Sequence, residues 1–171
     1  MKKLIFLAVL LLSLPIATAA QNAGYVNTVT ILEEIPEYTQ AQQQLERLKS
    51  QYDAQLQNEV KVIENMFNQY QAEKSRLNEL QRQSRENEII SKERSLKERE
   101  QEIFGQDGIM SAKSKELLDP VKDLVQSAID YIAKEKGLHM VFDISASQGI
   151  IFKDPKADIT PDVMKRLGLL N

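Results

Sequence analysis

The feature that most constrains this chain is a long polar stretch, from Glu37 to Lys136, with the composition of an exposed helix. It makes up more than half of the 171 residues and contains a single proline, Pro120. Its first half carries apolar or aromatic residues mostly at steps of three and four: Tyr38, Ala41, Leu45, Leu48, Tyr52, Leu56, Val60, Ile63, Phe67, Tyr70 and Leu77. This spacing aligns them in one narrow stripe, typical of a coiled-coil seam. A helix cannot bury such a stripe against itself, so we expect a partner along the seam.

A reversal of the chain near residues 77–79 would supply that partner. Leu77 closes the apolar stripe, and Asn78 followed by Gln81 has the pattern of an N-cap with a reciprocal capping residue. About 40 residues lie on either side, between Glu37 and Pro120, so each leg would be roughly 60 Å long. Equal legs favour an antiparallel helical hairpin, residues 37–119, that projects as an arm from a body. One unbroken rod of about 150 Å remains the alternative.

The N-terminal segment has the pattern of a secretory signal peptide, residues 1–19. Two lysines form a basic head, an apolar run follows, and Ala17-Thr18-Ala19 resembles a cleavage site. Cleavage after Ala19 and cleavage after Ala20 fit equally well. The apolar run is too short for a membrane-spanning helix, and a retained anchor is the disfavoured alternative. We therefore expect an exported, soluble mature protein.

The composition argues against nucleic-acid binding and against enzyme chemistry. The formal net charge is −3, and loss of the two lysines in the signal peptide makes the chain more acidic. The sequence has no cysteine for a disulfide, a thiolate metal site or a nucleophile. His139 lies in an expected strand without a nucleophile motif, and Gly105-Gln106-Asp107-Gly108 resembles neither a phosphate loop nor a calcium loop. We expect no catalytic residue, no metal and no cofactor.

A discontinuous body is expected from residues 20–36 and 120–171. Short apolar stretches at 24–27, 138–144 and 149–152 predict three strands. Residues 28–35 have helical spacing, with Asn27 or Thr28 as N-cap. Pro120 would kink the helix or start a new one, which places the base of the arm there. A wide apolar face over residues 121–133 predicts a helix packed on a core.

The end of the chain and the edges of the sheet complete this body. A short final helix is expected with Thr160 as N-cap and Pro161 as its first residue. Three short strands bury little apolar area in a monomer, and a small sheet leaves open edges. We therefore expect the body to oligomerise. The candidate interface residues are Tyr25, Val26, Val141, Phe142, Ile144 and Ile151.

The second leg, residues 79–119, is less apolar than the first and contains Gly105 and Gly108. Each glycine weakens a helix interior by about 1 kcal/mol relative to alanine. The pair is therefore either a local flaw in a long helix or a hinge, and the sequence favours neither. Apolar side chains of the arm are candidates for contact with a bound partner, although packing between the legs is the favoured explanation for any one of Tyr52, Met66, Phe67 and Tyr70. These candidates are Tyr52, Leu56, Met66, Phe67, Tyr70, Ile103 and Phe104.

The proposed tip of the arm is slightly basic in an acidic chain. Its basic candidates are Lys74, Arg76, Arg82 and Arg85, against Glu73 and Glu79. Such a cluster indicates contact with an anionic surface, whereas ordinary solubilising charge is the plainer explanation.

The order of these pieces is that of a known family. The signal peptide is followed by Gly24-Tyr25-Val26-Asn27, a Gln/Glu/Lys-rich hairpin, a strand containing Val141-Phe142-Asp143, and a final helix introduced by Asp158-Ile159-Thr160-Pro161. In this order the chain resembles the OmpH/Skp family over essentially its whole mature length. The two most specific pieces are the Val-Phe-Asp strand and the Asp-Ile-Thr-Pro helix start.

This resemblance implies a mostly α protein with a small β body (α+β), assembled as a homotrimer whose arms surround a cavity. It also implies an ATP-independent periplasmic holdase chaperone. The expected partners are unfolded outer-membrane proteins, held between the arms until membrane insertion. Export, a body with little core, a long arm and the lack of a catalytic motif are compatible with that role.

Two other classes of function stay open. A structural or adaptor coiled coil of the cell envelope would have one specific protein partner and no affinity for unfolded chains. A binder of anionic membrane surfaces or lipopolysaccharide would act through the tip. It would lose binding steeply with added salt and on neutralisation of Arg82 and Arg85.

Overall fold

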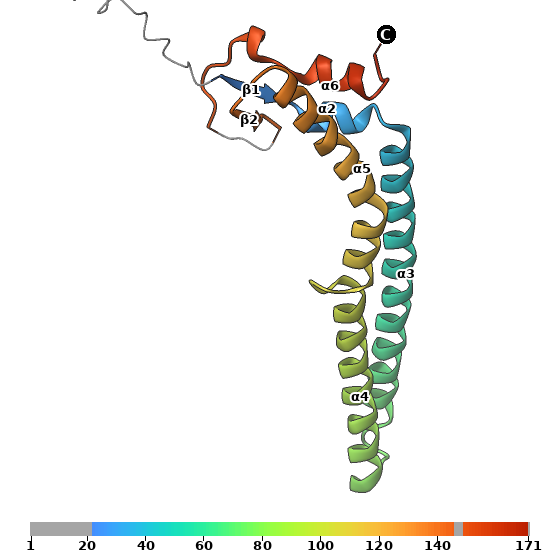
Figure 1. Ribbon diagram of the computed structural model, residues 1–171. Helices are drawn as coiled ribbons and strands as arrows, with labels where there is room; N and C mark the ends of the chain where they lie inside the picture. The colour runs from blue at the N-terminus through green and yellow to red at the C-terminus, as the bar shows by residue number, and fades with distance from the viewer. Residues whose placement is uncertain (1–21, 146–148, 171) are drawn as a thin grey trace, which may run out of the picture.

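The computed structural model describes residues 22–145 and 149–170, so the expected signal peptide lies outside the described residues. A long helical arm extends from a small body at one end (Figure 1). The elements in chain order are β1 (Ala23–Val26), α2 (Thr28–Glu33), α3 (Pro36–Glu73), α4 (Glu79–Phe104), α5 (Ile109–Glu135), β2 (Met140–Asp143), η1 (Pro155–Ala157) and α6 (Thr160–Arg166). The prediction of a mostly helical α+β chain is confirmed.

Helices α3 and α4 lie antiparallel and are joined by residues 74–78 (Figure 1). The side chain of Asn78 accepts a hydrogen bond from the Gln81 N–H (2.9 Å), and the Gln81 side chain accepts one from the Asn78 N–H (3.0 Å). This reciprocal pair satisfies two donors that a helix start otherwise leaves unpaired. The predicted cap at Asn78 is confirmed, and the chain reverses direction instead of forming one rod.

The second leg is divided at Gly105–Gly108. Of the two alternatives expected at Pro120, a kink or the start of a new helix, the start of a new helix is wrong. Helix α4 ends at Phe104, whereas Pro120 lies inside α5. A Cβ atom at Gly105 would overlap the carbonyl oxygen of Gln101, and one at Gly108 would lie 2.7 Å from that of Glu102. The backbone therefore approaches itself too closely for a larger residue. A helix-interior proline costs about 3 kcal/mol, which the burial of the apolar face beyond Pro120 offsets.

The core lies where α2, α5 and α6 meet β1 (Figure 1). The predicted wide apolar face of residues 121–133 supplies nearly half of it. The buried members are Val26, Ile31, Leu32, Ile35, Val121, Val125, Ala128, Ile129, Ile132, Ile159, Val163 and Met164. Helix α2 begins as expected, because the Asn27 side chain accepts a hydrogen bond from the Thr30 N–H (3.2 Å). These contacts fix the upper end of the arm.

The sheet has two parallel strands, β1 and β2, in the register Ala23↔Met140 to Val26↔Asp143. Parallel strands need a crossover connection, and here the whole arm is that connection. The third strand expected at 149–152 is not formed. The second edge of β1 is occupied at Tyr25, which bridges to Asp158 and whose carbonyl accepts the Ile159 N–H (2.9 Å). Residues 149–152 therefore have no strand partner among the residues that the structure describes.

The start of α6 differs by one residue from the prediction. Ile159 is the N-cap and Thr160 the first helical residue. The Thr160 hydroxyl instead accepts a hydrogen bond from the Asn27 N–H (3.0 Å), and the Thr160 N–H donates to the Asp158 carboxylate (2.8 Å). The Thr160 side chain thus connects α6 to the segment after β1. Local capping rules could not predict this hydrogen bond, because its two residues are far apart in the sequence.

Candidate functional site

The two legs of the arm are joined near the tip by Tyr70, whose side chain is only 4% exposed. Its hydroxyl donates a hydrogen bond to the carboxylate of Glu86 on α4. This hydrogen bond, burial of the ring and the negative charge of Glu86 together raise the pKa of Tyr70 above its ordinary value. Tyr70 therefore holds the arm together and is not available to a bound partner.

A second predicted contact residue, Ile103, is also buried within the arm. Its neighbour Phe104 is half-buried, at the end of α4. Apolar residues are sparse in α4, and Ile89 and Ile103 are the two that are buried. Tyr70 and Ile103 are therefore corrected from client contacts to packing residues.

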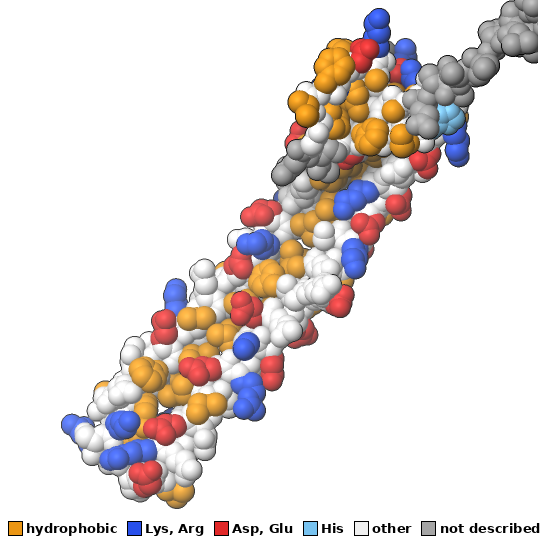
Figure 2. All heavy atoms as spheres, turned by 90° about the vertical axis from the view of Figure 1, so that its left-hand side faces the viewer, with side chains coloured by type: hydrophobic (Ala, Val, Ile, Leu, Met, Phe, Trp, Pro, Cys, Tyr) orange, Lys and Arg blue, Asp and Glu red, His pale blue; other side chains and the backbone are white. Residues whose placement is uncertain are grey.

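The other predicted contact residues of the arm keep exposed surface. Phe67 on α3 is 48% exposed, and Tyr52, Leu56 and Met66 are partly exposed. Figure 2 shows hydrophobic side chains in a broken band along the arm, with charged side chains on either side. This band is where the arm could contact another molecule.

Sequence reasoning missed several exposed apolar residues of the arm, among them Ile90, which is 53% exposed. Its neighbour Ile89 is buried against α3. Consecutive helical residues point about 100° apart, so only one residue of the Ile89-Ile90 pair can face the other leg. The Ile89-Ile90 doublet was therefore the sequence signal from which an exposed isoleucine could have been predicted.

At the tip, Arg82 has a structural role. Its Nε donates hydrogen bonds to the carbonyl oxygens of Lys74 (3.0 Å) and Leu77 (3.1 Å) and so closes the turn. The ammonium of Lys74 lies 5.4 Å from the centre of the Tyr70 ring, and Arg85 pairs with Glu88 (3.3 Å). Three of the four basic candidates thus have partners within the arm.

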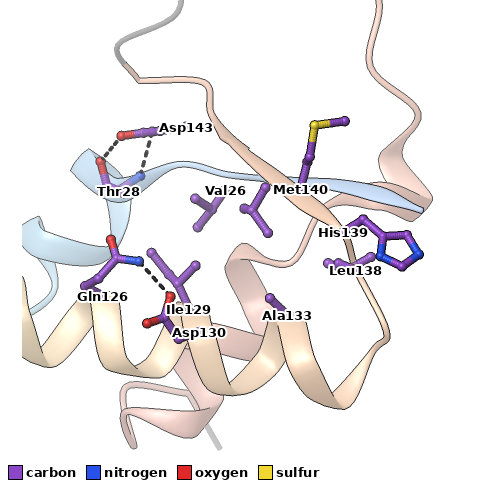
Figure 3. A pocket seen from close by; sticks show the side chains of 11 residues that line it. Val26, Thr28, Gln126, Ile129, Asp130, Ala133, Leu138, His139, Met140 and Asp143 are labelled. Atoms are coloured by element: carbon purple, nitrogen blue, oxygen red, sulfur yellow. Dashed lines mark hydrogen bonds between the residues drawn. The ribbon is translucent and has the colours of Figure 1, made fainter. Parts of the chain in front are cut away.

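In the body, a cavity of about 350 Å³ opens between β2 and α5 (Figure 3). Asp143 lies at its rim and receives hydrogen bonds from the Thr28 hydroxyl (2.5 Å) and from the Ser145 N–H (2.9 Å). Partial burial acts to raise the pKa of Asp143, but the hydrogen bonds from Thr28 and Ser145 outweigh it, and the pKa is lowered. His139 also lines the cavity. Among residues 22–145 and 149–170, no group of side chains could hold a metal ion.

The predicted interface residues divide into two groups. Tyr25 and Val26 are buried in the chain's own structure, so these two are corrected from interface residues to internal ones. Phe142 is half exposed on β2 and Ile151 is fully exposed, while Val141 and Ile144 are partly buried. Met140 and Phe152, which were not predicted, are also exposed beside them in the sequence. Apolar surface is therefore concentrated on β2 and on residues 150–152.

The sequence profile of the family described as outer membrane protein (OmpH-like) matches residues 22–167. The chain belongs to this OmpH-like family. Among solved structures, it is similar to the crystal structure of a protein from Caulobacter crescentus CB15, described as a candidate OmpH-like outer membrane chaperone. The two share 15% sequence identity with a TM-score of 0.63, over 88% of this chain and 86% of the other. At that identity the likeness supports the fold alone. No curated protein matches the chain.

The OmpH-like profile spans both the arm and the body, so both candidate surfaces lie in the part that the family shares. These surfaces are the exposed band of the arm and the apolar edge of β2 with residues 150–152. In the described part of this OmpH-like chain, no helix is long and apolar enough to span a membrane.

Proposed function

We propose that this OmpH-like chain is an ATP-independent holdase chaperone of the periplasm, which binds unfolded outer-membrane proteins between its helical arms. The observation that carries the proposal is the arm itself. Phe67 and Ile90 are large apolar side chains that the helix pair leaves about half exposed, on helices that are otherwise polar. Dispersed exposed apolar groups among charges suit many weak contacts with an unfolded chain better than one rigid pocket.

The arms would need to surround a cavity, and we propose that the body assembles three copies for this purpose. Within residues 22–145 and 149–170, no strand pairs with β2 on the side away from β1, and open edges favour the addition of another strand. Residues 150–152 are exposed and β-prone. Addition of this segment to β2 of the next copy would be a head-to-tail contact, which closes into a ring when the rotation allows it.

Native mass spectrometry of the mature protein tests both parts of the proposal. We expect a trimer alone, and a trimer with one bound chain after dilution with a urea-unfolded outer-membrane β-barrel. A trimer that does not bind the unfolded barrel would refute the holdase role and favour a structural or adaptor role in the cell envelope. A monomer or dimer would refute the proposed assembly.

A second candidate function, contact with an anionic membrane surface, is supported by one observation at the tip. Leu80 is 78% exposed and lies in the first turn of α4, beside the basic residues. An exposed apolar residue among cations suits the interface of an anionic bilayer. Sedimentation with vesicles of anionic lipid, in which Leu80→Ser and added salt both weaken binding, would support it. Binding unaffected by either change would exclude it.

A further inference from the structure

We infer that the groove between Phe67 and Ile90 binds an extended polypeptide segment in which a large apolar side chain, preferably aromatic, lies within about three residues of a lysine or arginine. This inference rests on the proposed holdase function and names the chemistry of the client segment.

The groove is built from both legs of the arm close to its tip. It has a volume of about 300 Å³. Tyr70 and Ile89 are buried beneath it, and Phe67 and Ile90 stand half exposed on its two sides. An apolar cavity of about 150 Å³ accommodates benzene, so this groove has room for one or two large side chains.

The apolar walls are not required for packing between the helices. Ile89 already fills the position that faces α3, and Tyr70 fills the position that faces α4. Phe67 and Ile90 therefore remain beside the seam with much of their surface in water. An apolar side chain that covers this surface removes it from water, which favours binding.

The charges around the groove select the partner. Two carboxylates, Glu86 and Glu93, and one ammonium, that of Lys74, line it. The Lys74 ammonium lies over the Tyr70 ring, and the Glu86 carboxylate accepts a hydrogen bond from the Tyr70 hydroxyl. The Glu93 carboxylate, in contrast, has no hydrogen-bond or ion-pair partner among the described residues. The surplus is negative, so a basic side chain beside the apolar one complements it.

The position of Glu93 relative to the apolar wall sets the length of the recognised segment. Ile90 and Glu93 are three residues apart on α4, which corresponds to about 4.5 Å along the helix. An extended chain covers that distance in about one to two residues. An apolar side chain in the groove and a basic side chain on Glu93 therefore fit within about three positions of one segment.

The test uses the full mature protein and three fluorescein-labelled, unstructured twelve-residue peptides. They carry phenylalanine with lysine, phenylalanine with glutamate, or alanine with lysine at the same positions. Fluorescence anisotropy should show at least fivefold tighter binding of the Phe/Lys peptide than of the other two. The double variant Phe67→Ser, Ile90→Ser should lose the preference for phenylalanine over alanine. Glu93→Gln should weaken binding of the Phe/Lys peptide and should not weaken binding of the Phe/Glu peptide.

Val62→Ser is the matched control, because Val62 is 54% exposed on the same helix but does not line the groove. It should bind the peptides as the unaltered protein does. Equal binding of the Phe/Lys and Phe/Glu peptides, or an equal loss in Val62→Ser, would overturn the inference. A change of oligomeric state in the double variant without loss of peptide binding would do the same, since a second copy would then occupy the groove.

Failure of the groove and failure of the holdase function are distinguishable by light scattering with a urea-unfolded β-barrel. If the protein suppresses aggregation and the double variant does so equally well, the function stands and the groove is wrong. If the unaltered protein does not suppress aggregation, the proposed function is wrong, and peptide binding alone decides on the groove.

Discussion

Tyr70 on α3 donates its hydroxyl hydrogen bond to Glu86 on α4 and thereby fastens the two legs of the arm near the tip. Tyr70→Phe removes this bond and leaves the ring in place. We expect the free energy of unfolding of the arm to fall by about 1 kcal/mol, measured by urea denaturation followed by circular dichroism. Tyr52→Phe is the control, because the Tyr52 hydroxyl has no hydrogen-bond partner among the described residues. An equal effect of both substitutions would show that the bond contributes nothing specific.

From the Tyr70–Glu86 hydrogen bond we also predict that the protein loses stability in alkali. The pKa of Tyr70 is raised in the folded protein above its ordinary 10.0, so the folded state retains the proton that the unfolded state releases. The stabilisation is complete below pH 10 and is lost as pH rises through the folded-state pKa. Urea midpoints measured from pH 8 upward should fall above pH 10, and the fall should be smaller in Tyr70→Phe. An identical pH profile in the variant would contradict this assignment.

The helix break predicts strong sensitivity to alanine at two positions. Gly105→Ala and Gly108→Ala place a Cβ against backbone carbonyls, so each should lower the free energy of unfolding by more than about 1 kcal/mol. Gly149→Ala is the control, since a Cβ there meets nothing within 4 Å. Thermal unfolding measures the effect. Increased helicity and stability would instead mean that α4 and α5 join into one helix once the glycines are removed.

From the hydrogen bonds to the Asp143 carboxylate we predict that the protein loses stability in acid. Its pKa is lowered from 3.8 by hydrogen bonds that end at its carboxylate, so the stabilisation is present above pH 3.8 and is lost as pH falls through the folded-state pKa. Asp143→Asn should remove part of this acid dependence and lower the free energy of unfolding at pH 7 by about 1 kcal/mol. The surface variant Asp107→Asn should leave both unchanged. Equal acid profiles for the two variants would rule out the role of Asp143.

We predict that the exposed segment 150–152 forms part of the interface between copies of the chain. Ile151→Asp should give a folded monomer by native mass spectrometry, because the Ile151 side chain is fully exposed within one chain and contributes nothing to its core. Circular dichroism should show an unaltered helix content. Val62→Asp, on the arm, should leave the oligomeric state unchanged. A variant Ile151→Asp that assembles normally would place the interface elsewhere.

At the tip, Arg82→Ala should loosen the turn, because two carbonyl oxygens lose their donor. Hydrogen exchange of residues 74–78 should become faster, while exchange in α5 stays the same. Arg76→Ala is the control, since the Arg76 side chain has no polar partner among the described residues. Unchanged exchange in Arg82→Ala would show that the Asn78–Gln81 cap is sufficient.

Much of the arm follows from local sequence rules. The three-and-four spacing of apolar residues and the Asn78–Gln81 pair depend on neighbours in the chain, and they correctly predicted the helices and the cap where the chain reverses. For Gly105 and Gly108 the sequence left a local flaw and a hinge open, and it expected a kink or a new helix at Pro120, whereas the helix ends at Phe104 and continues through Pro120. The cost of a proline in a helix is local, whereas the core burial that offsets it depends on α2 and α6.

The chain's sequence by itself determined the helices of the arm, the cap at Asn78 and the apolar face beyond Pro120, because each depends on residues within a few positions of one another. Only the tertiary structure decided that Tyr70 and Ile103 are packing residues, that Arg82 closes the tip, and that residues 149–152 pair with no strand in the described part of the chain. These outcomes depend on segments distant in sequence. The apolar stripe on one helix does not determine which of its side chains the opposite helix will cover.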